Sequence, residues 1–95
     1  MKRITTLKIL DRYRVWLRFD DGTEGNVDFS PLVGKGVFQA WNDYHVFEGA
    51  FISSDGRVLE WPGDLDFCAD SLFLRVTAKT PEELFPNLSH LHSHA

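Results

Sequence analysis

Three aspartates are the residues whose type and spacing come closest to a metal site. Asp64, Asp66 and Asp70 lie close together in the sequence, and carboxylate oxygens are the ligands that Ca²⁺ and Mg²⁺ prefer. Their spacing lacks the further ligands, the glycine and the closing glutamate of an EF-hand loop. Asp64 and Asp66 also suit turns, and Asp70 suits the first turn of a helix. We therefore expect no metal at these carboxylates.

The histidines and the cysteine offer little more. His90, His92 and His94 alternate, so in an extended chain their imidazoles share one side, where weak binding of Zn²⁺ or Ni²⁺ is chemically reasonable. A tail does not fix ligand geometry, and we interpret this arrangement as incidental. Cys68 is the single cysteine, which excludes an internal disulfide, and it follows Phe67 in an apolar stretch. We expect a buried, structural thiol.

Familiar catalytic motifs are missing from the sequence. It contains no G-x-S-x-G, no glycine-rich phosphate loop and no H-E-x-x-H. His45 stands alone, and a surface or hydrogen-bonded position suits it better than a catalytic one. Because no nucleophile is paired with a base, we predict a protein that is not an enzyme and binds no cofactor.

One alternating segment carries the strongest binding signal. In residues 13–19, Arg14, Trp16 and Arg18 point to one side of a predicted strand, and apolar residues point to the other. Two arginines beside an indole resemble a stacking platform for single-stranded nucleic acid. A solvated hairpin, in which the arginines meet carboxylates across the strands, explains the same residues, and we prefer it.

The register of this hairpin follows from its faces. Residues 23–29 alternate more weakly, and an Asp-Asp-Gly turn precedes them. A two-residue loop would mix the apolar and polar faces, whereas a three-residue loop places Arg18 opposite Glu24. The same loop places Arg14 opposite Asp28, so we predict the three-residue loop.

Charge is distributed unevenly along the chain. Residues 1–18 contain six bases and one acid, a net charge of +5, whereas residues 19–95 contain four bases and 13 acids, a net charge of −9. The basic start suggests an anionic partner, and the acidic remainder argues against wrapping nucleic acid. The charge distribution therefore disfavours nucleic acid as the partner.

The rest of the pattern predicts an α+β fold. Residues 3–10 form a further strand, giving an N-terminal meander, and Asp55-Gly56 marks a second hairpin between residues 51–53 and 57–61. We expect a small, β-rich antiparallel sheet of about five strands that carries short helices.

Short helices are predicted in three places. Ser30-Pro31 is a helix entry, aromatic residues at helical spacing over residues 37–47 indicate core, and apolar residues recur at helical spacing over residues 69–76. A capping box at residues 80–83 predicts one further turn. We expect one domain over residues 1–86 and a flexible tail over residues 87–95.

Length and composition restrict the class of protein and its cellular compartment. The 95 residues, 43% hydrophobic and 25% charged, suit one soluble domain. No apolar run reaches the roughly 18–20 residues of a membrane span, and the first residues lack the apolar core of a signal peptide. Since one cysteine also favours a reducing compartment, we expect a cytoplasmic protein with no membrane partner. The oligomeric state does not follow from the sequence.

Several segments occur in an order that resembles a known family. They are YRVWLRFDDG (13–22), VDFSPL (27–32), VFQAWND (37–43), VLEWP (58–62), and Asp66 followed by DSL (70–72). The order is similar to that of the bacterial domain of unknown function 2442 family, which is also described as similar to the N-terminal domain of a Nitrosomonas protein. The resemblance covers about residues 1–76.

The resemblance implies a small α+β fold and no known activity. Some family members resemble the front of a regulator followed by a helix-turn-helix domain, and we expect none here because the chain ends too early. Members tend to be encoded near other small proteins, which implies a partnered, toxin–antitoxin-like role. The family usually has Asn-Gly after its Trp-Pro and a later proline, where this chain has Gly63-Asp64 and Ala69. This member is therefore expected to bind something different if that loop is functional.

These observations lead to one hypothesis and one alternative. The first is a non-catalytic, bacterial partner-binding domain, one half of a small two-protein module. The alternative is a nucleic-acid-linked regulatory domain that uses the basic N-terminal strands. The candidate partner surface comprises Arg14, Trp16, Arg18, Trp61, Asp64 and Asp66.

Overall fold

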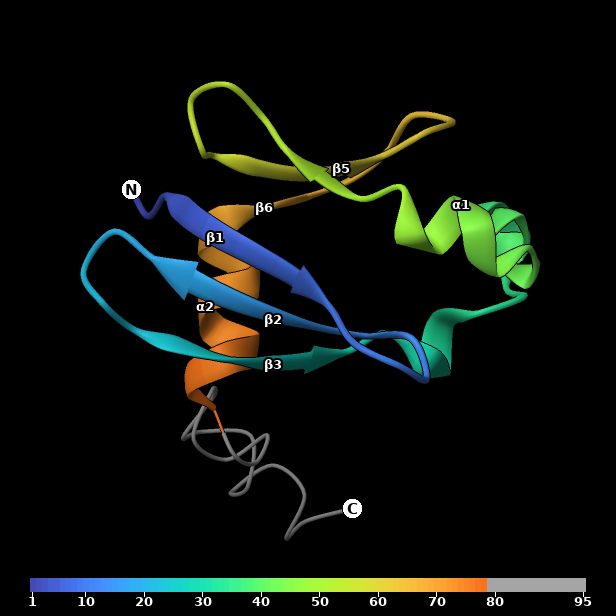
Figure 1. The fold of residues 1–95 in the computed structure, drawn as a ribbon, viewed down its shortest axis with the longest axis horizontal. Coiled ribbons are helices and arrows are strands. Elements are labelled where there is room, and N and C mark those ends of the chain that lie inside the picture. Colours follow the sequence, from blue (N-terminus) through green and yellow to red (C-terminus); the bar gives the residue numbers. More distant parts are fainter. Residues whose placement is uncertain (79–95) are drawn as a thin grey trace, which may run out of the picture.

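The computed structural model describes residues 1–78, which form two small antiparallel sheets and several short helices (Figure 1). Sheet A has the order β1-β2-β3, from β1 (Ile4–Ile9), β2 (Arg14–Phe19) and β3 (Glu24–Asp28). Sheet B has the order β4-β5-β6, from β4 (Phe51–Ile52), β5 (Val58–Trp61) and β6 (Leu65–Cys68). The helices are η1 (Ser30–Leu32), η2 (Gly36–Asn42), α1 (Tyr44–Glu48) and α2 (Ala69–Thr77).

The α+β class is confirmed, but the strand count and arrangement differ from the prediction. The chain has six strands in two sheets, not about five in one. The sixth strand, β6, contains Asp66, which the sequence analysis assigned to a turn. Leu65 and Phe67 alternate inward around Asp66, but four residues following a turn give too short a pattern to reveal a strand. The turn assignment is correct for Asp64, whose φ is 66°.

The three-residue hairpin loop is confirmed. β2 and β3 pair Val15 with Val27 and Leu17 with Gly25, so that both faces stay uniform. The turn is closed by Gly22, whose N–H donates to the Phe19 carbonyl at 2.9 Å. Gly22 has a φ of 87°, a left-handed conformation that glycine adopts at no steric cost.

The helices predicted within residues 1–78 also form, with η2 tighter than an α-helix. Pro31 lies at the start of η1, as its fixed φ favours. Asp43 caps α1, because its carboxylate accepts the His45 N–H at 3.0 Å. Asp70 lies in the first turn of α2, where a negative charge is favoured by the helix dipole.

Aromatic side chains fill the core between the sheets. Trp41 and Phe47 from the helical segment are fully buried, together with Phe29 and Trp61, and their rings meet mostly edge to face. The aromatic residues at helical spacing therefore form core, as predicted. The Trp61 indole N–H donates to the Phe47 carbonyl at 2.8 Å, which fixes sheet B against α1.

Helix α2 covers one face of sheet A, as Figure 1 shows behind the strands. It packs against Gly25 on β3, where a Cβ would lie 2.8 Å from Val76 Cγ1. The N-terminus is tied to the same helix, since the Lys2 N–H donates to Asp70 Oδ1 at 2.7 Å. The inner face of sheet A is therefore closed, and its other face is available for contacts.

Some sequence predictions lie outside the described residues. These are the domain boundary at residue 86, the helical turn predicted after the capping box at residues 80–83, the tail over residues 87–95, and His90, His92 and His94.

Candidate functional site

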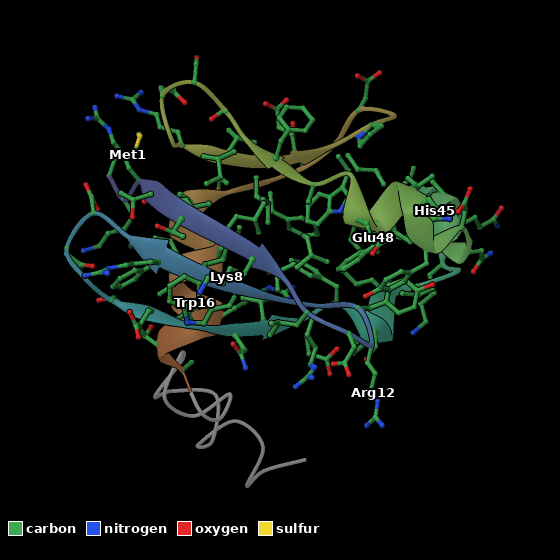
Figure 2. All side chains as sticks on the ribbon, viewed as in Figure 1. Met1, Lys8, Arg12, Trp16, His45 and Glu48 are labelled. Carbon is green, nitrogen blue, oxygen red and sulfur yellow. The ribbon has the colours of Figure 1, made fainter. Side chains whose placement is uncertain are left out.

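The outer face of sheet A gathers the sequence-predicted binding residues on one surface. Alternation along each strand turns apolar side chains toward α2 and polar ones outward. Within residues 1–78 no helix or strand packs over these outward side chains (Figures 1 and 2). We call this surface the outer face of sheet A; its residues are Thr6, Lys8, Arg14, Trp16, Arg18, Glu24, Asn26 and Asp28.

Trp16 lies at the centre of this face. It is half-buried, and it is paired with Lys8 on β1 and with Asn26 on β3. The Lys8 Nζ lies 5.1 Å from the centroid of the indole ring, within the range of a cation–π interaction. Figure 2 shows the two side chains together on the face turned toward the viewer. A large aromatic surface beside a cation is thus presented on a rigid strand.

Arg14 lies opposite Asp28 in the predicted register, but its ion pair is made elsewhere. Its guanidinium binds the Asp11 carboxylate, and its Nε donates to the Asp11 carbonyl at 3.3 Å. The hydrogen bond from Arg14 holds the pKa of Asp11 below its usual value. Arg12 and Tyr13 have positive φ values of 56° and 63°, and this turn brings Asp11 back beside the arginine. The pattern of alternation could not reveal that turn.

Arg18 meets Glu24 as predicted. Its Nε lies 4.0 Å from Glu24 Oε2, and both side chains are more than half exposed. An exposed pair at this distance contributes little to stability, about 0–1 kcal/mol, so both groups can accept new partners at low cost.

Asp28 has a structural role of its own at the end of β3. Its carboxylate accepts the Ser30 N–H at 2.9 Å, and bonds from Ser30 lower the pKa of Asp28. It therefore joins β3 to η1 while its side chain stays exposed.

The three remaining candidate residues lie away from this face. Trp61 is 2% exposed and points into the core, so its proposed place on a partner surface is wrong. Asp66 is exposed on sheet B, paired with Glu60 on β5, and Asp64 lies in the turn before it. Inward alternation on β5 explains the burial of Trp61, because Leu59 and Trp61 share one side.

Cys68 and His45 are both on the surface. The prediction of a buried Cys68 is wrong, since the residue is exposed as the last of β6, paired with Val58. Phe67 turns inward, so alternation turns the thiol outward. The His45 side chain is 94% exposed, and its Nδ1 lies 3.5 Å from Glu48. In the part of the chain that the structure describes, no three His, Cys, Asp or Glu residues are placed to hold a metal ion.

An open cleft of about 490 Å³ lies between the start of β1 and the β4–β5 turn. Its lining includes Arg3, Asp20, Ser53 and Asp55. The Arg57 N–H and the Ser53 hydroxyl both bond to Asp55 and lower its pKa. The Ser53 hydroxyl donates to this carboxylate and accepts the Val58 N–H at 3.1 Å, so it serves the turn. These groups close a loop and provide no nucleophile activated by a base.

Two three-stranded antiparallel sheets around an aromatic core, with short helices beside them, define a small α+β fold. A family model described as "Protein of unknown function (DUF2442)" matches residues 4–78, and the chain belongs to that family. No curated protein and no solved structure gives a match. No helix within residues 1–78 is long and apolar enough to cross a membrane.

Sequence reasoning missed Lys8 as a member of the site. Its position in the first strand was predicted, but the strand's register on β2 was not, so nothing placed it beside Trp16. The available signal was the alternation of Thr6, Lys8 and Leu10 against Leu7 and Ile9. A register shift between Ile4 and Thr6 hides that signal at the start of the strand.

Proposed function

We propose that the protein is a non-catalytic domain that binds a small protein partner through the outer face of sheet A, with Trp16 as its central anchor. The observation that carries the proposal is the half-buried Trp16 at the centre of a sheet face that no described element covers.

The composition of the face supports a protein interface. Tryptophan and arginine are enriched among residues that dominate binding energy, and such anchors lie near the centre of an interface within a ring of weaker contacts. Here Trp16 lies between Arg14 and Arg18, with charged and amide side chains around it.

The proposal extends to the biological setting. A single, exposed cysteine suits a reducing compartment, so we place the protein in the bacterial cytoplasm. The family resemblance supports a role as one half of a small, toxin–antitoxin-like pair of proteins. Membership of the family supports no activity, since the family is described as one of unknown function.

The test is quantitative co-purification from the native host with the tagged full chain. We expect one small protein to be recovered in stoichiometric amount with the original chain. Trp16→Ala should lose it. His45→Ala, which changes an exposed residue on α1, is the matched control and should retain it. Recovery of the same protein with Trp16→Ala at the same yield would exclude the outer face of sheet A as the binding surface.

Nucleic acid is the second candidate, favoured by the position of Lys8 over the indole. Lys8 makes no ion pair within residues 1–78, and it adds a third cation to the face of the two arginines. Binding of this kind must weaken steeply with salt, because each neutralised phosphate releases counterions. We expect no binding tighter than about 10⁻⁴–10⁻⁶ M at physiological salt. Sub-micromolar binding that is lost in Lys8→Ala combined with Arg18→Ala would favour the nucleic-acid candidate.

A further inference from the structure

We propose that β3 is a strand-pairing edge that binds an extended, basic segment of the protein partner opposite Glu24 and Asp28. The inference deepens the proposed function and rests on it, because it names how the main chain of the partner is held.

The backbone of β3 has hydrogen-bonding groups directed away from the sheet. Thr23 accepts a bond from β2 at 2.8 Å, and Phe29 donates one to the residue before β2 at 2.9 Å. In an antiparallel pair only alternate residues bond to the neighbouring strand. The peptide groups of Glu24, Asn26 and Asp28 therefore point outward from the free edge of sheet A, and within residues 1–78 no backbone group pairs with them.

This edge is exposed, and it separates a polar face from an apolar one. Glu24, Asn26 and Asp28 are all exposed, whereas Val27 is 3% exposed and Gly25 is packed by α2. A strand added here would extend both faces, so its outward side chains would be polar and its inward ones apolar.

The charges on β3 select the kind of strand. Residues directly opposite one another on adjacent strands interact, and like charges there are unfavourable. A strand paired with β3 on the side away from β2 would place two of its residues, four positions apart, opposite Glu24 and Asp28. Lys or Arg at those two positions would be attracted to the carboxylates. Two β3 strands paired antiparallel about Asn26 would instead oppose Glu24 to Asp28 twice. The edge therefore disfavours a second copy of this chain and favours a basic segment.

The free edge of β1 is a poorer candidate for the same role. At its start the Ile4 N–H already donates to the Gly56 carbonyl at 2.7 Å, and β4 packs alongside the strand. A lysine and a register shift on β1 are also features with which natural edge strands avoid pairing. Sheet A thus has one edge partly occupied by sheet B and one edge open in the described chain.

The test measures amide hydrogen exchange by NMR in the full chain. The probe is a peptide of about ten residues in which lysine alternates with valine or threonine, and the control peptide has glutamate in place of lysine. We expect the lysine peptide to slow exchange at Glu24, Asn26 and Asp28 at least about ten-fold. The glutamate peptide should leave exchange unchanged.

Asn26→Pro is the decisive variant. The Asn26 N–H points away from β2, so proline removes no bond of the sheet and the fold should persist. This variant should abolish protection by the lysine peptide, whereas Trp16→Ala should retain it. Equal protection by both peptides, protection that survives Asn26→Pro, no protection at all, or slow exchange at these amides in the free chain would each overturn the inference.

The two proposals fail in different ways. If capture of the partner depends on Trp16 but not on Asn26→Pro, the proposed function stands and the pairing edge is wrong. If capture does not depend on Trp16, the proposed function itself is wrong.

Discussion

The hydroxyl group of Tyr13, the residue before β2, links this residue to the aromatic core through one hydrogen bond. The Tyr13 hydroxyl donates to the Trp41 carbonyl at 2.7 Å, and its ring meets Phe47 edge to face at 5.0 Å. Tyr13→Phe removes the hydroxyl and keeps the ring. We expect the free energy of unfolding to fall by about 0.5–1.5 kcal/mol, the usual net value of one hydrogen bond. Chemical denaturation measures the change. An unaltered denaturation midpoint would show that the hydrogen bond of the Tyr13 hydroxyl contributes no net stability.

Asp21 makes the stability of the fold depend on pH in the acid range. The Thr23 N–H bond at 2.9 Å, followed by the Lys2 ammonium at 3.0 Å, lowers the pKa of Asp21 to about 2 from its usual 3.8. Between about pH 4 and pH 2 the unfolded chain binds this proton and the folded chain does not, so stability falls as the pH falls. Asp21→Asn should make the decrease in Tm over that window shallower. If Tm fell with pH equally steeply in the variant and in the original chain, this assignment would be contradicted.

At the scale of elements, the contact between α2 and β3 depends on the missing side chain of Gly25. A Cβ there would lie 2.8 Å from Val76 Cγ1, closer than real Cβ contacts allow. Gly25→Ala should destabilise the fold by about 1–3 kcal/mol through overpacking. Adding Val76→Ala should recover part of that loss, which a double-mutant cycle measures. If the effects of the two substitutions on the free energy of unfolding were strictly additive, the strain caused by Gly25→Ala would not arise from contact with Val76.

The elements differ in how well sequence predicts them, for identifiable physical reasons. The β2–β3 register was predictable because a one-residue slip would pair Val15 with Asp28 and mix the apolar and polar faces. β6 was not predictable, because its four residues include Asp66 and follow a turn. The ion pair of Arg14 was also beyond prediction, since it depends on left-handed backbone at Arg12.

At the scale of the whole molecule, the candidate site follows from which face of each sheet is covered. Alternation predicted that Arg14, Trp16 and Arg18 share a side, but only tertiary structure shows that α2 lies on the opposite side. The same alternation, applied to β5, would have placed Trp61 in the core with Leu59. The register of β1 on β2 could not be derived, and it is this register that brings Lys8 to Trp16.

The exposure of Trp16 can be checked without a partner. Trp41 and Trp61 are 0% and 2% exposed, so acrylamide should quench mainly the fluorescence of Trp16. Trp16→Phe should remove most of the quenchable emission and change the Tm little, because the side chain is only half-buried. Strong quenching that persists in this variant would mean that a core tryptophan is accessible.

Calorimetry with the purified partner tests the central claim most directly. The Kd of the partner should rise at least about ten-fold for Trp16→Ala, as expected for a central interface residue. The control His45→Ala should bind with the Kd of the original chain, since its side chain is exposed on α1. Equal Kd values for Trp16→Ala and the original chain would contradict the assignment of the outer face of sheet A as the binding surface.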